Sequence, residues 1–277
     1  MKATYRGGRS PTPDSRLPTP VAKRRFGQNF LHDPGVIARI VRSIHPHPDD
    51  TLVEIGPGLG ALTQPLLAAA GKLTVIELDR DIVPLLRETY GDNSGLTIIQ
   101  ADALKMDYAS LAPIAGKLRL IGNLPYNIST PLLFHLLKFA DCIADMHFML
   151  QKEVVDRMCA EPDTEAYGRL TVTLAARAQC DSLFHVGPGA FKPAPKVDSA
   201  VVKLTPRPPP FEIRDLAAFD RIVTAAFGQR RKTLSNALKS VMDTDAIRAA
   251  GIDPGIRAEK LPPKAFATLA AQLPERQ

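Results

Sequence analysis

Short apolar segments alternate with helical segments through the middle of the chain, and this alternation restricts the fold more than any other feature. Apolar runs of strand length occur at 52–55, 73–78, 96–100, 118–121 and 147–150. We interpret 170–176 and 200–204 as the sixth and seventh strands. Strands that alternate with helices predict an α/β fold with parallel βαβ units and a doubly wound sheet. Ligands of such sheets bind at the carboxyl ends of the strands.

The segments on either side of this region have a different character. Residues 1–22 are rich in Pro and Arg and predict a flexible tail. Asp33 and Pro34 predict the start of a helix, because Asp caps helices and Pro suits a first helical position. The proline-rich 206–210 predicts a linker, followed by helical segments at 216–238 and 245–273, with a break at 251–255. We therefore expect a tail at 1–22, a main domain at 23–205 and a small helical domain at 206–277.

Charge is unevenly distributed along the chain. The balance of Lys and Arg over Asp and Glu is +7 in residues 1–48, −5 in 49–205 and +4 in 206–277. An acidic centre between basic ends predicts a catalytic domain flanked by surfaces that could hold phosphates. No apolar run reaches the roughly 20 residues of a membrane span. Three widely separated cysteines indicate neither a disulfide framework nor a metal site, so we expect a cytoplasmic protein that needs no metal.

A glycine-rich loop and two acidic residues predict a cofactor site. Gly56 and Gly58 follow the first strand of the sheet, where glycine lets the backbone turn and approach a ligand closely. This loop alone also fits the dinucleotide fingerprint, so a nicotinamide oxidoreductase stays open at this point. Glu77 ends the next strand, where a carboxylate can bind ribose hydroxyls. Asp102 ends the third strand and suits a hydrogen bond from an adenine amine, which favours S-adenosylmethionine.

The sequence Asn123-Leu124-Pro125-Tyr126 follows the fourth strand and predicts a site for an adenine base. The lone pair of an adenine amine is delocalised into the ring, so the nitrogen is a poor nucleophile. The Asn123 side-chain oxygen and the Leu124 carbonyl can accept hydrogen bonds from the amine and favour tetrahedral nitrogen. Tyr126 offers a face for base stacking. The alternative is a tight turn with a buried tyrosine, since Asn and Pro are common in turns.

Several stretches resemble the ribosomal RNA adenine dimethyltransferases, and among them the bacterial small-subunit family of kasugamycin-sensitivity methyltransferases. The resemblance runs from about Lys23 to about Leu273 and rests on 25–31, 54–60, 75–79, 122–130, 149–153, 167–170, 191–200 and 227–233. It implies a class I, Rossmann-like methyltransferase fold with S-adenosylmethionine as cofactor. It also implies that the protein dimethylates two adjacent adenosines in the 3'-terminal hairpin of 16S rRNA within the small ribosomal subunit.

The resemblance implies further site residues. Gln28, Asn29 and Leu31 would lie over the cofactor near its methionine end. Gly56, Glu77, Asp102 and Asn123 would complete the cofactor pocket, and Phe191 would stack on the target adenine opposite Tyr126. The protein would act as a monomer and as a late assembly factor of the small subunit.

The basic run Arg230-Arg231-Lys232 predicts contacts to rRNA phosphates, although a solvated helix face would have the same composition. Two alternatives to the small-subunit enzyme stay open. One is a large-subunit rRNA adenine methyltransferase, and the other is a non-catalytic RNA-binding factor of the same fold. Asn123 and Tyr126 argue against lost catalysis, and the 149–153 and 227–233 stretches favour the small-subunit enzyme.

Overall fold

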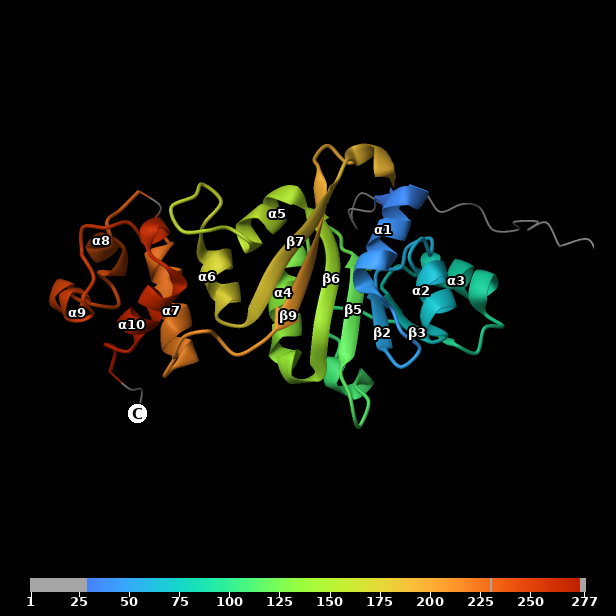
Figure 1. Ribbon diagram of the computed structural model, residues 1–277, viewed down its shortest axis with the longest axis horizontal. Coiled ribbons are helices and arrows are strands. Elements are labelled where there is room, and N and C mark those ends of the chain that lie inside the picture. The colour runs from blue at the N-terminus through green and yellow to red at the C-terminus, as the bar shows by residue number, and fades with distance from the viewer. Residues whose placement is uncertain (1–28, 230, 275–277) are drawn as a thin grey trace, which may run out of the picture.

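The computed structural model describes residues 29–229 and 231–274, and a seven-stranded sheet forms its centre (Figure 1). The strand order is β4-β3-β2-β5-β6-β9-β7. The strands are β2 (Thr51–Ile55), β3 (Leu73–Glu77), β4 (Leu96–Gln100), β5 (Leu118–Asn123), β6 (Ile143–Gln151), β7 (Ala178–Val186) and β9 (Ser199–Pro206). A separate two-stranded antiparallel sheet joins β1 (Phe30–Leu31) to β8 (Phe191–Lys192).

The order of the strands creates the place where a ligand binds. β2 pairs in parallel with β3 on one side and with β5 on the other, so the chain changes direction across the sheet between them. β6 continues the parallel order beside β5, whereas β9 is antiparallel to both β6 and β7. The carboxyl ends of β2 and β5 therefore form a crevice of the kind that binds ligands in α/β sheets.

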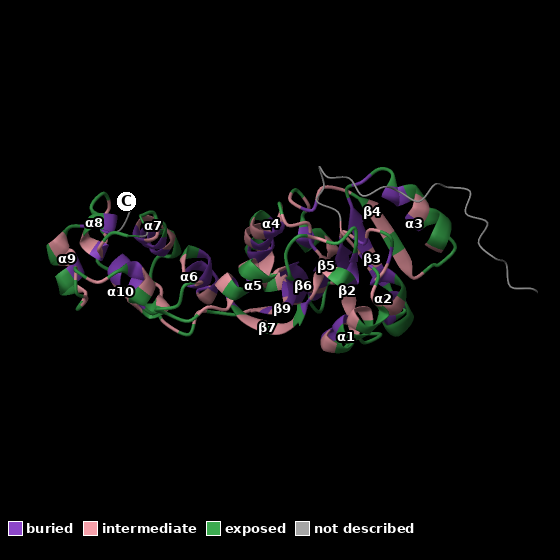
Figure 2. Ribbon diagram, turned by 90° about the horizontal axis from the view of Figure 1, so that it is seen from above, coloured by how far each residue is buried: buried purple, intermediate pink, exposed green. Residues whose placement is uncertain are grey.

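Helices cover both faces of the sheet, as predicted for a doubly wound fold. One face packs against α1 (Pro34–Ile44), α2 (Thr63–Ala70) and α3 (Ile82–Tyr90). The other packs against α4 (Ser129–Leu136), α5 (Lys152–Met158), α6 (Arg169–Ala175) and the 3₁₀ helices η2 (Tyr108–Leu111) and η3 (Leu137–Cys142). Buried residues concentrate in the central strands between these layers (Figure 2).

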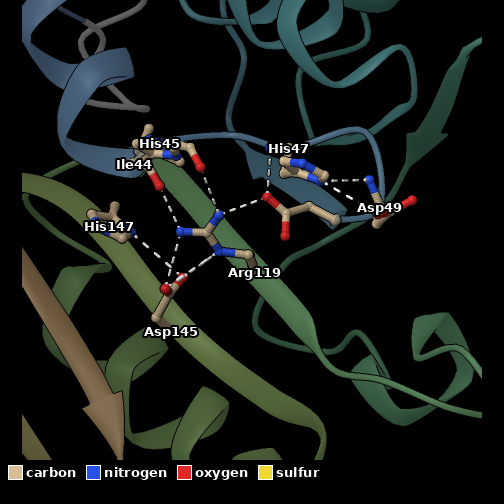
Figure 3. Close-up of polar contacts among 8 residues, drawn as sticks. Ile44, His45, His47, Asp49, Arg119, Asp145 and His147 are labelled. Carbon is tan, nitrogen blue, oxygen red and sulfur yellow. Dashed lines mark hydrogen bonds and ion pairs between the residues drawn. The ribbon is translucent and has the colours of Figure 1, made fainter.

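The first helix begins where the sequence predicted. The Asp33 carboxylate accepts a hydrogen bond from Val36 N at 2.9 Å, and Pro34 is the first helical residue. The far end of α1 is anchored to the sheet through Arg119 at the start of β5 (Figure 3). The Arg119 guanidinium donates to the carbonyls of Ile44 and His45 and binds the carboxylate of Asp145 on β6.

The strand predicted at 170–176 is wrong, because these residues form α6 and the sixth strand is β7. The run Leu170-Thr-Val-Thr-Leu174 is almost entirely buried, as a central strand would be. A short helix buried on all sides shows the same continuous apolar pattern, so periodicity does not separate the two. β7 is buried only at its ends, Ala178 and Val186, and is intermediate or exposed between them, so its sequence carries a weak apolar signal.

Four α-helices follow β9: α7 (Leu216–Ala226), α8 (Leu234–Leu238), α9 (Thr244–Ala249) and α10 (Pro263–Ala270). The break predicted at 251–255 lies between α9 and α10 as expected, whereas the helix predicted at 216–238 is divided into α7 and α8. The cluster of buried residues at the centre of these helices also takes in Tyr167, Val172 and Ala176. The Tyr167 hydroxyl donates to the Leu261 carbonyl at 2.7 Å. A domain boundary at 206 remains a prediction, since the cluster draws on both sides of it.

Candidate functional site

A cleft opens at the carboxyl ends of β2, β3, β4 and β5, where the sequence placed the site. It encloses about 1140 Å³, part of it open to solvent. The lining residues that the sequence singled out are Asn29, Leu31, Gly56, Gly58, Glu77, Asp102, Asn123, Leu124 and Tyr126. The structure thus brings together all the predicted cleft residues among those it describes except Phe191.

The glycine loop forms the floor of the cleft with backbone angles that glycine adopts without strain. Gly56 and Gly58 have φ values of +69° and +54°, in the left-handed region. A Cβ on Gly56 would meet no atom within 4 Å, so the space beside it is open. A Cβ on Gly58 would lie 3.2 Å from the ring of Phe30, which shows how closely β1 approaches the loop.

Two buried carboxyl groups lie beside this loop. Glu77 accepts a hydrogen bond from Asp79 N at 2.8 Å and a longer one from Gly58 N at 3.4 Å. Burial raises the pKa of Glu77, and these backbone N–H groups oppose the rise. Glu54 accepts from the Thr63 hydroxyl at 2.6 Å. Burial raises the pKa of Glu54 to about 7, and the Glu77 carboxylate adds to the rise.

The loop after β4 holds Asp102 at the edge of the cleft. Asp102 Oδ1 accepts a hydrogen bond from Leu104 N at 3.0 Å, which fixes the carboxylate against its own turn. The buried Tyr108 hydroxyl donates to the Ala103 carbonyl at 3.1 Å. These two hydrogen bonds hold the loop in place. Asp102 Oδ2 is available to accept a hydrogen bond from a ligand.

Asn123 at the end of β5 is oriented by a residue far away in the sequence. Its Nδ2 donates a hydrogen bond to the Asn29 carbonyl at 3.1 Å, so the amide oxygen points away from that contact. Leu124 N donates to the Met149 carbonyl at 3.2 Å, which fixes the next peptide unit against β6. Within the described chain, no group donates a hydrogen bond to Asn123 Oδ1 or to the Leu124 carbonyl. Both acceptors are therefore ready to bind an external donor.

Tyr126 lines the cleft and is half-buried. Its hydroxyl lies 2.9 Å from the hydroxyl of Ser199, the first residue of β9. Nothing in the sequence indicated this contact, because the two residues are 73 positions apart and Ser199 shows no motif of its own. Phe30 was missed as well, since nothing in the sequence indicated that its ring would pack on Gly58.

Phe191 does not line the cleft in this structure. It pairs with Leu31 in the small two-stranded sheet, is only 3% exposed and belongs to the same hydrophobic cluster as Ile121 and Met149. The predicted stacking of Phe191 on a base therefore remains a prediction. Its strand nevertheless adjoins the one that lies over the glycine loop, so Phe191 is close to the cleft without facing it.

The remaining predicted residues lie apart from the cleft or outside the description. Arg231 and Lys232 are exposed between α7 and α8, at the far end of the molecule from β3 and β4 (Figures 1 and 2). Gln28 and Arg230 lie outside the described residues. In the part of the chain that the structure covers, no group of three His, Cys, Asp or Glu side chains is placed to hold a metal ion. Over the same residues no helix is long and apolar enough to cross a membrane.

Comparison with solved structures identifies the type of fold. The structure superposes on a 23S rRNA methyltransferase, ErmE, with a TM-score of 0.68 and 28% identity, over 88% of this chain and 99% of the other. It superposes on a dimethyladenosine transferase from Plasmodium falciparum with a TM-score of 0.72 and 26% identity, over 87% and 95%. Together with the sheet order and the glycine loop, these likenesses define a class I methyltransferase.

The sequence comparisons narrow the class. The family model described as ribosomal RNA adenine dimethylase matches residues 21–274. A ribosomal RNA small subunit methyltransferase A from Hahella chejuensis is 56% identical over 90% of this chain and 92% of its own. The protein of the same name from Pseudomonas aeruginosa is 54% identical over 92% and 95%. The chain belongs to the ribosomal RNA adenine dimethylase family.

Proposed function

We propose that this protein transfers methyl groups from S-adenosylmethionine to the N6 amines of two adjacent adenosines in the 3'-terminal hairpin of 16S rRNA. Each adenosine receives two methyl groups. The observation that supports the chemistry most directly is the Asn123 amide, whose Nδ2 is bound by the Asn29 carbonyl while its oxygen stays available. The high identity to small-subunit methyltransferases supports the choice of substrate.

The residues present fit S-adenosylmethionine. The open space at Gly56 would accept the amino acid end of the cofactor close to the backbone, where a side chain would fill it. The Glu77 carboxylate can accept from ribose hydroxyls, and Asp102 can accept from the cofactor's adenine amine. Asn29 and Leu31 would cover the methionine end. When bound, S-adenosylmethionine supplies an electrophilic methyl group on a positively charged sulfur.

The protein's contribution is to position and polarise the amine. Asn123 Oδ1 and the Leu124 carbonyl accept hydrogen bonds from its two N–H groups, which draws the nitrogen lone pair out of conjugation with the ring. Tyr126 stacks on the base, which must leave its own stack to enter the site. The nitrogen becomes acidic only after it has gained the methyl group, so its proton passes to water and no side chain must act as base. Positioning and fixed dipoles thus provide most of the rate enhancement.

Other residues of the chain would bind the RNA substrate. Phe191 would stack on the target adenine opposite Tyr126 after a local rearrangement that exposes its ring. Arg230, Arg231 and Lys232 would contact rRNA phosphates. We also propose that the protein acts as a monomer in the cytoplasm, on an immature small subunit, and so takes part in late assembly. A preference for unmethylated subunits would determine when the protein leaves the subunit.

Mass spectrometry of rRNA tests the proposed function. Purified small or large subunits that lack the modification are incubated with the protein and isotope-labelled S-adenosylmethionine. We expect two dimethylated adenosines in 16S rRNA and no label in 23S rRNA. Label confined to 23S rRNA would favour the large-subunit alternative, and no label in either would favour a non-catalytic RNA-binding factor.

Asn123→Ala tests the mechanism. At saturating cofactor we expect kcat to fall by about 10²–10³-fold, the loss typical for one preorganised polar group in a dry site. The melting temperature should change little, because the Asn123 side chain is only part-buried. Methylation by Asn123→Ala at the wild-type rate would contradict the mechanism.

A further inference from the structure

Tyr126 is held by two serines from different parts of the chain, one at its main-chain carbonyl and one at its hydroxyl. The Ser129 hydroxyl, at the start of α4, donates to the Tyr126 carbonyl at 3.1 Å. The Ser199 hydroxyl lies 2.9 Å from the phenol oxygen at the other end. Both serines are buried, with 2% and 1% of their surface exposed. The ring therefore has a defined position in the absence of any base.

Ser199 connects the segment that carries Tyr126 to the sheet. As the first residue of β9, it pairs with Gln151 on β6 and with Val186 on β7. The preceding residue is fixed as well, because the Asp198 carbonyl accepts from Lys152 N at 2.9 Å. Tyr126 itself belongs to the irregular segment between β5 and α4. Its hydroxyl contact thus ties a side chain of that segment to three adjacent strands.

The contact is a hydrogen bond between neutral groups. Burial raises the pKa of the Tyr126 phenol, and the Ser199 hydroxyl opposes that rise. The phenol is therefore protonated at neutral pH and is no candidate for a base. A buried serine hydroxyl is unfavourable unless it is hydrogen-bonded, and among the described residues the phenol is the only partner of the Ser199 side chain. Each hydroxyl accordingly depends on the other.

We propose that Ser199 is a positioning residue for adenine methylation, which acts by holding the Tyr126 ring in the plane on which the target base stacks. This inference rests on the proposed function. Because base stacking sets the distance between the amine and its acceptors, a ring that can tilt would lower the fraction of bound substrate in the reactive geometry. Binding of the subunit depends mainly on phosphate contacts elsewhere and should change little.

A double-mutant cycle tests the proposal. Ser199→Ala, Tyr126→Phe and the double variant are compared with the wild type in steady-state methylation of small subunits at saturating cofactor. Each single variant should lower kcat about tenfold, the loss expected for one hydrogen bond, with KM for the subunit within about twofold. The double variant should be no slower than Tyr126→Phe, because both changes remove the same contact.

Two further variants separate positioning from packing. Ser199→Thr keeps the hydroxyl and should retain most of the rate. Thr173→Ala removes a buried hydroxyl from α6, away from the cleft, and should lower the melting temperature without changing kcat. A Ser199→Ala variant with the wild-type kcat would overturn the inference, as would losses that multiply in the double variant. Absence of methylation by the wild-type protein would instead overturn the proposed function.

Discussion

Glu54 lies in surroundings that are unusual for a side chain of its type. Its carboxyl group is buried beside the glycine loop, with the Thr63 hydroxyl as donor and the Glu77 carboxylate nearby. These surroundings disfavour the charged form. The folded protein therefore keeps a proton on Glu54 up to about pH 7, whereas the unfolded chain loses it near the ordinary value of 4.5.

This difference predicts how Glu54→Gln changes stability. Between about pH 4.5 and 7 the folded state binds more protons than the unfolded state, so the contribution of Glu54 to the free energy of unfolding falls as the pH rises. Above pH 7 the stabilising contribution of Glu54 is lost completely. Gln has no charge to bury and can still accept from Thr63. The free energy of unfolding of Glu54→Gln should exceed that of the wild type by about 1–3 kcal/mol at pH 8 and match it within about 1 kcal/mol at pH 4.5.

Urea unfolding at the two pH values measures this effect. Glu88→Gln is the matched control, because Glu88 is exposed on α3 and its replacement should change stability little at either pH. Equal stability of wild type and Glu54→Gln at both pH values would show that Glu54 is charged in the folded state at no penalty.

At the scale of elements, the sequence predicted the frame of the sheet and the helix start at Asp33. Six of the seven strands of the sheet, the five parallel strands and β9, were recognised because each carries a continuous apolar run of characteristic length. α6 was mistaken for a strand because burial on all sides removes the helical period. β7 was missed because an edge strand with mixed exposure carries little pattern.

The candidate site was predictable to the extent that it follows from strand order. Gly56, Glu77, Asp102 and Asn123 each follow a parallel strand, and such ends meet at one edge. Contacts between distant segments could not be predicted in this way. The Asn29–Asn123 and Tyr126–Ser199 hydrogen bonds depend on how β1 and β9 pack, and no local pattern encodes that. The burial of Phe191 depends on the same packing.

The anchor of α1 on the sheet leads to a prediction for Arg119→Met. The guanidinium binds Asp50 at 2.6 Å and Asp145 at 3.1 Å, with all three side chains largely shielded from solvent (Figure 3). Burial tends to raise the pKa of Asp145, but His147 and Arg119 outweigh it and lower the pKa to about 2. Replacing Arg119 by Met leaves two shielded carboxylates without a partner cation. We therefore expect the free energy of unfolding to fall by about 3 kcal/mol at pH 7.

The pH dependence of this loss is a second check. The low pKa of Asp145 stabilises the wild type above the unfolded pKa of 3.8, and this stability is lost as the pH falls towards 2. The difference in free energy of unfolding between wild type and Arg119→Met should therefore decrease as the pH falls over that range. Arg248→Met is the control, because the exposed ion pair with Asp245 contributes little. Equal losses in the two variants by chemical denaturation would contradict a structural role for the network.

At the scale of the whole molecule, the segment between α7 and α8 lies far from β2, β3, β4 and β5, at whose carboxyl ends the cleft opens (Figure 1). A substrate that reaches both must be large, as a ribosomal subunit is. Reversing Arg230, Arg231 and Lys232 to Glu should therefore weaken subunit binding and lower the slope of log affinity against log salt by about 2–3 units. Methylation at saturating subunit concentration should be retained.

Filter binding at several salt concentrations measures this slope. A matched reversal at Arg214, Arg248 and Arg257 changes the same net charge in the same group of helices. Each of these arginines already faces a carboxylate, so their reversal should alter the slope less. Identical slopes for the two triple variants would mean that only net charge matters, and that the basic run makes no specific phosphate contact.

The place of β9 between β6 and β7 has a consequence for the newborn chain. β7 pairs with no strand of the central sheet except β9, although β7 is synthesised first. Until residue 206 has emerged from the translating ribosome, β7 has no partner and the edge of β6 is uncovered. An open edge of this kind invites pairing with other chains. Because β9 is the last strand of the sheet along the chain, Ser199 can reach Tyr126 only after the other strands have been synthesised, and a nascent chain halted before β9 would lack this contact and expose the edge of β6.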